Sequence, residues 1–182
     1  MPEVGPSIFL SRVSFQKLQI LKTMADGSME LTELHRKSTN WAKTVDEIVK
    51  LEKKIFPKHE SLARSFDDEL KKKNSGLLYL QFNSEIAGYV MYTSPSSLCA
   101  VITKLAVKEK YRRQGHGEAL MKAAIEKCRS KRINRISLHV DPLRSSAVSL
   151  YKKLGFQIDT LVTAYYSSDR DAYRMFIDFD NE

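Results

Sequence analysis

The sequence predicts a single α/β domain, in which helices cover both faces of one mixed sheet. Three observations predict this fold class. Residues 77–92 have the pattern of two strands joined by a tight turn at Asn83-Ser84, and apolar strands then alternate with amphipathic helices. The chain has 182 residues, which suits one domain. A domain of this size buries about 70% of its unfolded surface, so it needs neither disulfides nor a metal for stability.

The first 27 residues differ in composition from the rest and are expected to form an N-terminal extension to a domain at residues 28–182. They contain only Glu3 and Asp26 as acids, and a short apolar and basic run extends from residue 8 to residue 22. An organellar transit peptide is one interpretation of residues 1–23, but basic residues are few for that role. A tail or a partner-docking helix explains the segment at least as well.

The first half of the domain is expected to begin with a short strand at residues 30–35. A helix follows, capped by Asn40 or Thr44 and ended by Pro57. A highly charged second helix is predicted at residues 64–73, before the turn residues Asn74, Ser75 and Gly76.

The second half of the domain carries the alternating pattern. Strands are predicted at residues 77–82 and 85–92. Residues 98–107 are β-branched and apolar enough for a buried strand, and residues 118–129 place their apolar side chains on one helical face. The remaining elements are a strand at 135–140, a helix at 145–154, and closing strands at 157–166 and 172–179.

Composition limits the classes of function. The chain carries 30 Lys and Arg against 22 Asp and Glu, a net charge of +8, which favours an anionic partner such as nucleic acid, a membrane surface or a phosphate-bearing cofactor. No apolar stretch approaches the roughly 20 residues of a membrane-spanning helix. Cys99 and Cys128 lack ligand-like spacing to histidine, so we interpret them as free thiols in a reducing compartment and expect no metal.

The most informative stretch is residues 105–120, where a strand leads through a short loop into a helix. Gly115 and Gly117 would expose backbone N–H groups at the helix N-terminus, which favours phosphate, and Arg112 and Arg113 add positive charge. The stretch therefore predicts a pyrophosphate cradle. It matches neither the dinucleotide fingerprint nor the P-loop, and a helix cap on a solvated basic turn is the alternative.

Two motifs resemble those of the GNAT superfamily of N-acetyltransferases. Arg112-x-x-Gly115-x-Gly117 resembles the acetyl-CoA signature Q/R-x-x-G-x-G/A, and residues 147–156 resemble the later A-x-x-x-Y-x-x-x-G-F block. The resemblance covers about residues 29–179 and implies the GNAT fold, with acetyl-CoA as co-substrate. The cofactor contacts that it implies are Leu105, Ala106, Val107, Arg112, Arg113, Gln114, Gly115, His116, Gly117, Arg144 and Tyr151.

Three further stretches resemble the branch of the superfamily that acetylates protein N-termini. Residues 137–140 resemble its strand with a proposed catalytic histidine, here His139. Tyr165-Tyr166 resembles its substrate-binding hairpin, and Ile55-Phe56-Pro57 resembles the opposite wall of the peptide groove. The acceptor-binding residues implied are Phe56, Pro57, Lys58, Tyr165 and Tyr166; packing of both tyrosines against the core is the alternative.

The chain also departs from this branch at three positions. Arg144 replaces the usual asparagine, Val101 stands where relatives can carry a catalytic tyrosine, and Lys58 stands where they have an apolar or acidic residue. The preferred acceptor therefore does not follow from the resemblance.

The resemblance implies direct transfer in a ternary complex rather than through an acetyl-cysteine. Alternation along residues 135–141 places His139 on the face opposite the apolar side chains. We therefore expect His139 to act as the general base, directly or through water; a hydrogen-bonded structural histidine is the alternative. Tyr151 is expected to be the general acid, and backbone N–H groups at residues 105–107 are expected to orient the thioester and stabilise the oxyanion. His116 is expected on the helix surface rather than in catalysis.

The predicted function is N-acetylation of the α-amino group of protein N-termini, with a lysine side chain or a small-molecule amine as the alternative acceptor. The protein could act together with a ribosome or an auxiliary subunit, and the sequence leaves this open. A membrane is not expected, because no apolar stretch is long enough to span one. Specific nucleic acid is not expected, because the basic runs at 71–73 and 129–135 lack interleaved aromatics. A cofactor-binding scaffold without catalysis is the non-enzymatic alternative. The expected location is the cytoplasm, with the nucleus or an organelle as alternatives.

Overall fold

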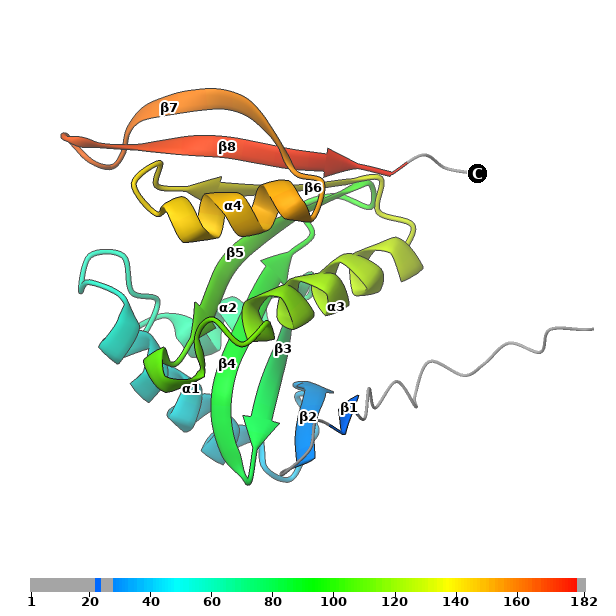
Figure 1. Ribbon diagram of the computed structural model, residues 1–182. Coiled ribbons are helices and arrows are strands. Elements are labelled where there is room, and N and C mark those ends of the chain that lie inside the picture. Colours follow the sequence, from blue (N-terminus) through cyan, green and yellow to red (C-terminus); the bar gives the residue numbers. More distant parts are fainter. Residues whose placement is uncertain (1–21, 24–27, 180–182) are drawn as a thin grey trace, which may run out of the picture.

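The computed structural model describes residues 22–23 and 28–179 (Figure 1). They form one eight-stranded sheet with the strand order β1-β2-β3-β4-β5-β6-β8-β7. Every neighbouring pair is antiparallel except β5 and β6, so the sheet is mixed, as predicted. The strands are β1 (Lys22–Thr23), β2 (Ser28–Glu33), β3 (Ser75–Phe82), β4 (Glu85–Thr93), β5 (Cys99–Val107), β6 (Arg135–Val140), β7 (Gln157–Ser167) and β8 (Arg170–Asp178).

Helices cover both faces of the sheet. The helices are α1 (Trp41–Ile55), α2 (Phe66–Lys71), the short 3₁₀ turn η2 (Glu109–Tyr111), α3 (His116–Ser130) and α4 (Ser145–Lys153). In Figure 1, α3 and α4 lie in front of the sheet and α1 and α2 behind it. Each pair buries its own hydrophobic cluster against the strands, so the sheet separates two cores.

The described part of the chain bears on several other expectations. Of the predicted extension, residues 1–27, it contains only β1, which pairs with β2. The hairpin turn is confirmed, because Asn83 (φ 46°) and Ser84 (φ 63°) are both left-handed.

The helix predicted at residues 64–73 is shorter and spans only Phe66–Lys71. At its C-terminal end, Arg36 Nη2 donates hydrogen bonds to the carbonyls of Leu70 and Lys72 at 2.7 and 2.8 Å. Within the described residues, no helix has the length and apolarity needed to cross a membrane.

Strand β5 differs from the continuous buried strand that its composition predicts. Its parallel pairing with β6 ends at Ile102 and Leu138, although β5 continues to Val107. A register shift on its other side leaves Thr103 without a partner residue in β4, and the Thr103 hydroxyl donates to the carbonyl of Met91 at 3.1 Å. The irregularity is typical of a β-bulge and reverses the alternation, so Ile102 and Ala106 belong to cores on opposite faces.

Candidate active site

The loop after η2 has the shape of an anion-binding turn. Arg113 (φ 61°) and Gly115 (φ 81°) are both left-handed, and α3 begins immediately afterwards at His116, two residues before the predicted start. The Arg112 Nε donates to the carbonyl of Val107 at 3.0 Å, and the Gln114 Nε2 donates to that of Lys110 at 3.0 Å. These bonds tie the loop to β5 and η2 at the N-terminus of α3, where backbone N–H groups favour an anion.

Glu85 at the start of β4 fixes η2 beneath this loop. Its carboxylate accepts hydrogen bonds from Lys108 Nζ at 2.9 Å, Lys110 Nζ at 2.6 Å and the Tyr111 hydroxyl at 2.9 Å. These donors lower the pKa of Glu85 to about 2. The carboxylate therefore stays charged and offsets one of the two lysine charges, while Arg112 and Arg113 are exposed at the loop.

His116 is not the surface residue that the sequence predicts. Its side chain is 8% exposed, and its ring lies edge-on to Tyr111 with the centroids 6.3 Å apart. Its Nε2 lies 3.3 Å from Gln114 Oε1. Because α3 starts at this residue, the imidazole packs beside η2, and burial lowers its pKa. We interpret His116 as a neutral support of the loop.

The glycine at position 117 is not required by the packing of the chain itself. A Cβ there would lie 3.5 Å from Leu150 Cδ2 and 3.9 Å from Val107 Cγ2, which are ordinary contacts. At Gly115 the left-handed backbone itself favours glycine. Gly117 therefore fits a position at which the missing side chain leaves room for a ligand that approaches α3 from outside the chain.

The divergence of β5 and β6 provides the second part of the site. Leu105, Ala106 and Val107 lie beyond the last β5–β6 pair, so among the described strands the β6-facing edge of this segment has no partner. Apart from the Val107 carbonyl, which accepts from Arg112, the backbone groups on this edge lie outside the β5–β6 ladder, where an extended ligand can pair with them. This edge leads directly through η2 to the anion-binding turn, which gives one polar track from residue 105 to residue 117.

His139 lies on β6 with the orientation that alternation predicts. Leu138 and Val140 are buried in the core, whereas His139 is half-buried and faces away from it. Its ring stacks on Tyr165, with 4.4 Å between centroids and 10° between planes. Burial, and secondarily the charge of Arg174, lowers the pKa of His139. The imidazole is therefore mainly neutral at pH 7.

Tyr151 lies on α4 and is 7% exposed. Its ring is tilted against Phe156, with 6.0 Å between centroids. Burial, and secondarily the neighbouring Tyr166, raises the pKa of Tyr151 to about 12. The hydroxyl is thus protonated at neutral pH and can donate a proton or a hydrogen bond.

The two hairpin tyrosines owe their positions to an irregular stretch of β7. Pairing with β8 shifts between Val162 and Ser167, so residues 163–166 have only Asp171 opposite them. Ala164 is left-handed (φ 52°), and its N–H donates to Asp171 Oδ1 at 2.9 Å. Tyr165 is 46% exposed, which contradicts core packing for that residue, and it contacts Tyr166 edge-on at 4.9 Å.

Of the residues expected to form the opposite wall of a peptide groove, Phe56 is buried, and Pro57 and Lys58 are exposed. Lys104 Nζ lies 4.0 Å and Arg144 Cζ 5.9 Å from the centroid of the Phe56 ring. Arg144 Nη2 also donates to Glu60 Oε2 at 3.0 Å. The expected contact of Arg144 with a cofactor phosphate stays a prediction, and its guanidinium is already paired with Glu60.

Sequence reasoning missed the charged residues that pack around Phe56. Lys104 donates to the backbone carbonyl of Glu60 and lies 3.4 Å from Glu52 Oε1. Glu52 is fully buried, and its Oε1 accepts the N–H of Leu62 at 2.8 Å. The available signals were a single lysine in an apolar strand and a glutamate on the apolar face of α1.

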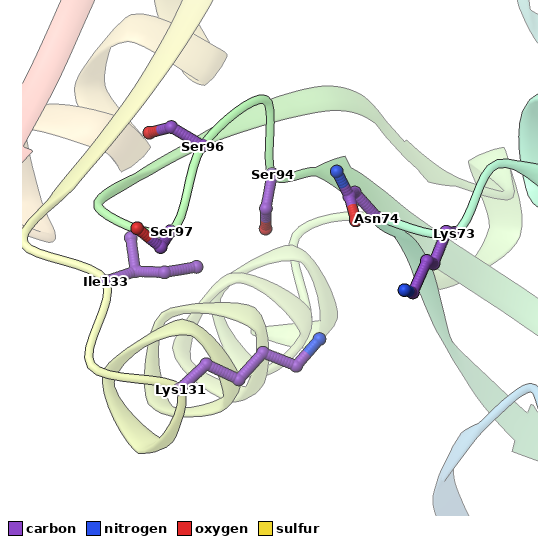
Figure 2. Close-up of a pocket in the computed structure, with 7 residues that line it drawn as sticks. All are labelled: Lys73, Asn74, Ser94, Ser96, Ser97, Lys131 and Ile133. Carbon is purple, nitrogen blue, oxygen red and sulfur yellow. The ribbon is translucent and has the colours of Figure 1, made fainter.

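A separate cavity of about 350 Å³ lies at the other end of the sheet, where β4 ends and β5 begins (Figure 2). It is lined by Lys73, Asn74, Ser94, Ser96, Ser97, Lys131 and Ile133. None of the predicted site residues lines it. The described residues also contain no group of three or more potential metal ligands.

Comparisons with known proteins agree with this geometry. Residues 41–156 match the acetyltransferase (GNAT) family. An N-alpha-acetyltransferase of Sulfurisphaera tokodaii is 29% identical over 143 residues, covering 72% of this chain and 85% of that protein. The Escherichia coli ribosomal-protein-S18-alanine N-acetyltransferase shares the fold with a TM-score of 0.73 at 21% identity, covering 85% and 96% of the two chains. Arabidopsis thaliana NAA60 in complex with acetyl-CoA gives a TM-score of 0.72 at 16% identity, covering 84% and 99%.

Acetyl-CoA fits the track between residues 105 and 117. The unpaired edge of β5 offers backbone groups to an extended amide-containing arm, and the turn before α3 offers N–H groups and two arginines to a pyrophosphate. Gly117 leaves room for the close approach of a phosphate. The chain thus belongs to the acetyltransferase (GNAT) family and is an acetyl-CoA-dependent N-acetyltransferase.

Proposed function

We propose that this enzyme acetylates the α-amino group of protein N-termini. One observation carries the proposal: an aromatic series joins the expected base to the expected acid. His139 stacks on Tyr165, Tyr165 contacts Tyr166, and Tyr166 is close enough to Tyr151 to influence its pKa. The ring contacts run from β6 into the hairpin, and the last ring, Tyr166, acts on Tyr151 of α4 through its charge. A free amine bound against it would meet both a proton acceptor and a proton donor.

The proposed chemistry follows from the protonation states. An α-amine has a pKa near 8, so about a tenth of it is neutral at pH 7 and able to attack. Neutral His139 accepts a proton from the amine, directly or through water, and Tyr151 returns a proton to the departing sulfur. Acetyl-CoA supplies the activated acetyl group. The edge at residues 105–107 would orient the thioester carbonyl, and Arg112 and Arg113 would hold the phosphates.

Names of relatives support this choice of acceptor. The Sulfurisphaera relative is an N-alpha-acetyltransferase, and the Escherichia coli neighbour acts on an alanine of a ribosomal protein. We propose the residues at Phe56, Pro57, Lys58, Tyr165 and Tyr166 as the peptide groove. The ribosome or an auxiliary subunit as partner, and the cytoplasm as location, are parts of the same proposal.

A peptide panel tests the acceptor. Peptides with a free N-terminus, varied at the first two residues, are compared with N-terminally blocked copies that keep one internal lysine, and CoA release is measured. We expect turnover with free N-termini and none after blocking. Equal turnover with blocked, lysine-containing peptides would assign the enzyme to side-chain amines instead, and a small-molecule amine in the same assay tests that alternative.

A further inference from the structure

Four charged side chains from separate segments meet beside the proposed peptide groove. Glu60 lies between α1 and α2, Asp141 follows β6, Arg144 precedes α4, and Arg170 begins β8. Arg170 joins the two acids: its Nη1 donates to Glu60 Oε1, and its Nη2 and Nε donate to Asp141 Oδ2 at 2.6 and 3.1 Å. Arg144 Nη2 donates to the other Glu60 oxygen at 3.0 Å. We call these four residues the ionic cluster.

The acidic members of the ionic cluster are buried and hydrogen-bonded. The Glu60 and Asp141 side chains are each 6% exposed, and the remaining oxygen of Asp141 accepts the N–H of Leu143 at 2.8 Å. Burial acts to raise the pKa of both acids, but their arginine partners outweigh it and lower both pKa values. Two negative and two positive charges sum to zero. The cluster therefore neither attracts nor repels an incoming ammonium group strongly, which favours a geometric role over electrostatic steering.

The ionic cluster contacts both proposed walls of the groove. Arg170 Cζ lies 5.1 Å from the centroid of the Tyr166 ring, on the hairpin side. Arg144 Cζ lies 5.9 Å from the centroid of Phe56, on the other side. Glu60 is also bound through its backbone carbonyl to Lys104 of β5. Movement of either wall would break hydrogen bonds to buried acids, which is costly.

We propose that Glu60 and Arg170 are positioning residues for the acceptor: their ion pair fixes the distance between the Phe56 wall and the Tyr166 wall. This inference rests on the proposed function, since it concerns the same groove. Arg170 contacts Tyr166 directly, and Glu60 is joined to the Phe56 wall through Arg144 and Lys104, which both lie over the Phe56 ring. Loss of the ion pair should therefore weaken acceptor binding and leave acetyl-CoA binding unchanged. Arginine is required at position 170 because its planar fork spans two carboxylates, which a lysine amine cannot do in the same geometry.

The test compares Michaelis constants in Arg170→Gln, Glu60→Gln and the double variant. We expect KM for an N-terminal peptide to rise about tenfold in each single variant, with KM for acetyl-CoA within about twofold of wild type. Because both residues act through one contact, the double variant should match the worse single variant rather than multiply the two effects. Arg170→Lys should recover only part of the loss.

Arg135→Gln is the matched control. It also removes one arginine between β6 and β8, where Arg135 donates to Asp178 at 2.5 and 2.7 Å, but it lies at the other end of that strand pair. Both of its KM values should equal those of wild type. An unchanged peptide KM in folded Arg170→Gln, or an equal rise in both KM values, would overturn the proposal. Folding is checked by circular dichroism, and Glu60→Gln and Arg170→Lys decide the outcome if Arg170→Gln does not fold.

Failure of the proposed function gives a different result. If wild type does not turn over free N-termini, the acceptor is taken from the lysine and small-amine arms of the peptide panel. The same KM comparison is then made with that amine. A rise in KM for the acceptor alone would still support the positioning role of Glu60 and Arg170. Absence of that rise would overturn the role, whichever acceptor the enzyme uses.

Discussion

The pKa of His139 determines how its predicted role as base would appear in a measurement. Only a neutral imidazole accepts a proton, and burial lowers the pKa of His139 below its usual 6.5. We expect kcat/KM for a peptide to fall on acidification in two steps, one near 8 from the α-amine and one below 6.5 from His139. In His139→Gln the lower step should be absent and the upper one retained. Persistence of both steps in that variant, measured from pH 5 to 9, would exclude His139.

Tyr151 gives a second prediction at the scale of a single atom. Phenylalanine keeps the ring that packs on Phe156 and removes only the hydroxyl, so Tyr151→Phe should fold normally. Loss of a general acid lowers kcat by about 10²–10⁴-fold, and we expect a decrease in that range with an unchanged Kd for acetyl-CoA. Kinetics and calorimetry measure the two quantities.

Tyr92→Phe is the control for this prediction. Tyr92 is likewise buried, and burial raises its pKa, but its hydroxyl accepts from Lys131 at the far end of the sheet. Its loss should leave kcat unchanged. If Tyr151→Phe lowers kcat no more than Tyr92→Phe does, Tyr151 is only a core residue.

At the scale of elements, local signals predicted most of the fold. Asn83-Ser84 marked the hairpin because both residues tolerate left-handed backbone, and the apolar face of residues 118–129 identified α3. The bulge at Thr103 and the irregular stretch before Ser167 were not predictable, because each depends on pairing with a neighbouring strand. The same holds for the ionic cluster, since Glu60 and Arg170 are 110 residues apart in sequence. Motifs indicated the expected cofactor and acceptor residues, whereas the long-range contacts around the proposed acceptor groove could not be predicted from them.

The turn before α3 allows a prediction with its own internal comparison. An added Cβ at Gly115 meets nothing within 4 Å, so Gly115→Ala should cost only the left-handed backbone conformation, about 1–2 kcal/mol of unfolding free energy. We also expect KM for acetyl-CoA to rise, because the turn must shift to relieve that strain. Gly117→Ala has ordinary backbone geometry and contacts, so it should change stability much less. Urea denaturation of both variants checks this, and equal losses of stability would contradict it.

At the scale of the whole molecule, a second buried network joins the helices behind the sheet to the strands beneath the site. Glu52 of α1 accepts from the Tyr89 hydroxyl of β4 and from Leu62 N–H, and it pairs with Lys104 of β5. The Lys104 side chain is 12% exposed and lies over Phe56. The network therefore links the packing of α1 to the position of the proposed groove wall.

This network makes stability depend on both charges together. Lys104→Met leaves the Glu52 carboxylate buried without its cation, and we expect a loss of about 3–5 kcal/mol in unfolding free energy, measured with urea at pH 7. Glu52→Gln with Lys104→Met removes both charges and should regain much of that loss, because two neutral side chains need no desolvation of an ion. Lys50→Met is the control: Lys50 lies on α1, as Glu52 does, and pairs with Asp46 at 2.7 Å on the exposed surface. Loss of this exposed pair should have no measurable effect on the unfolding free energy. A double variant less stable than Lys104→Met alone would contradict the expected recovery, and would show that the Glu52 carboxylate stabilises the fold without its cation, through its hydrogen bonds to Tyr89 and Leu62.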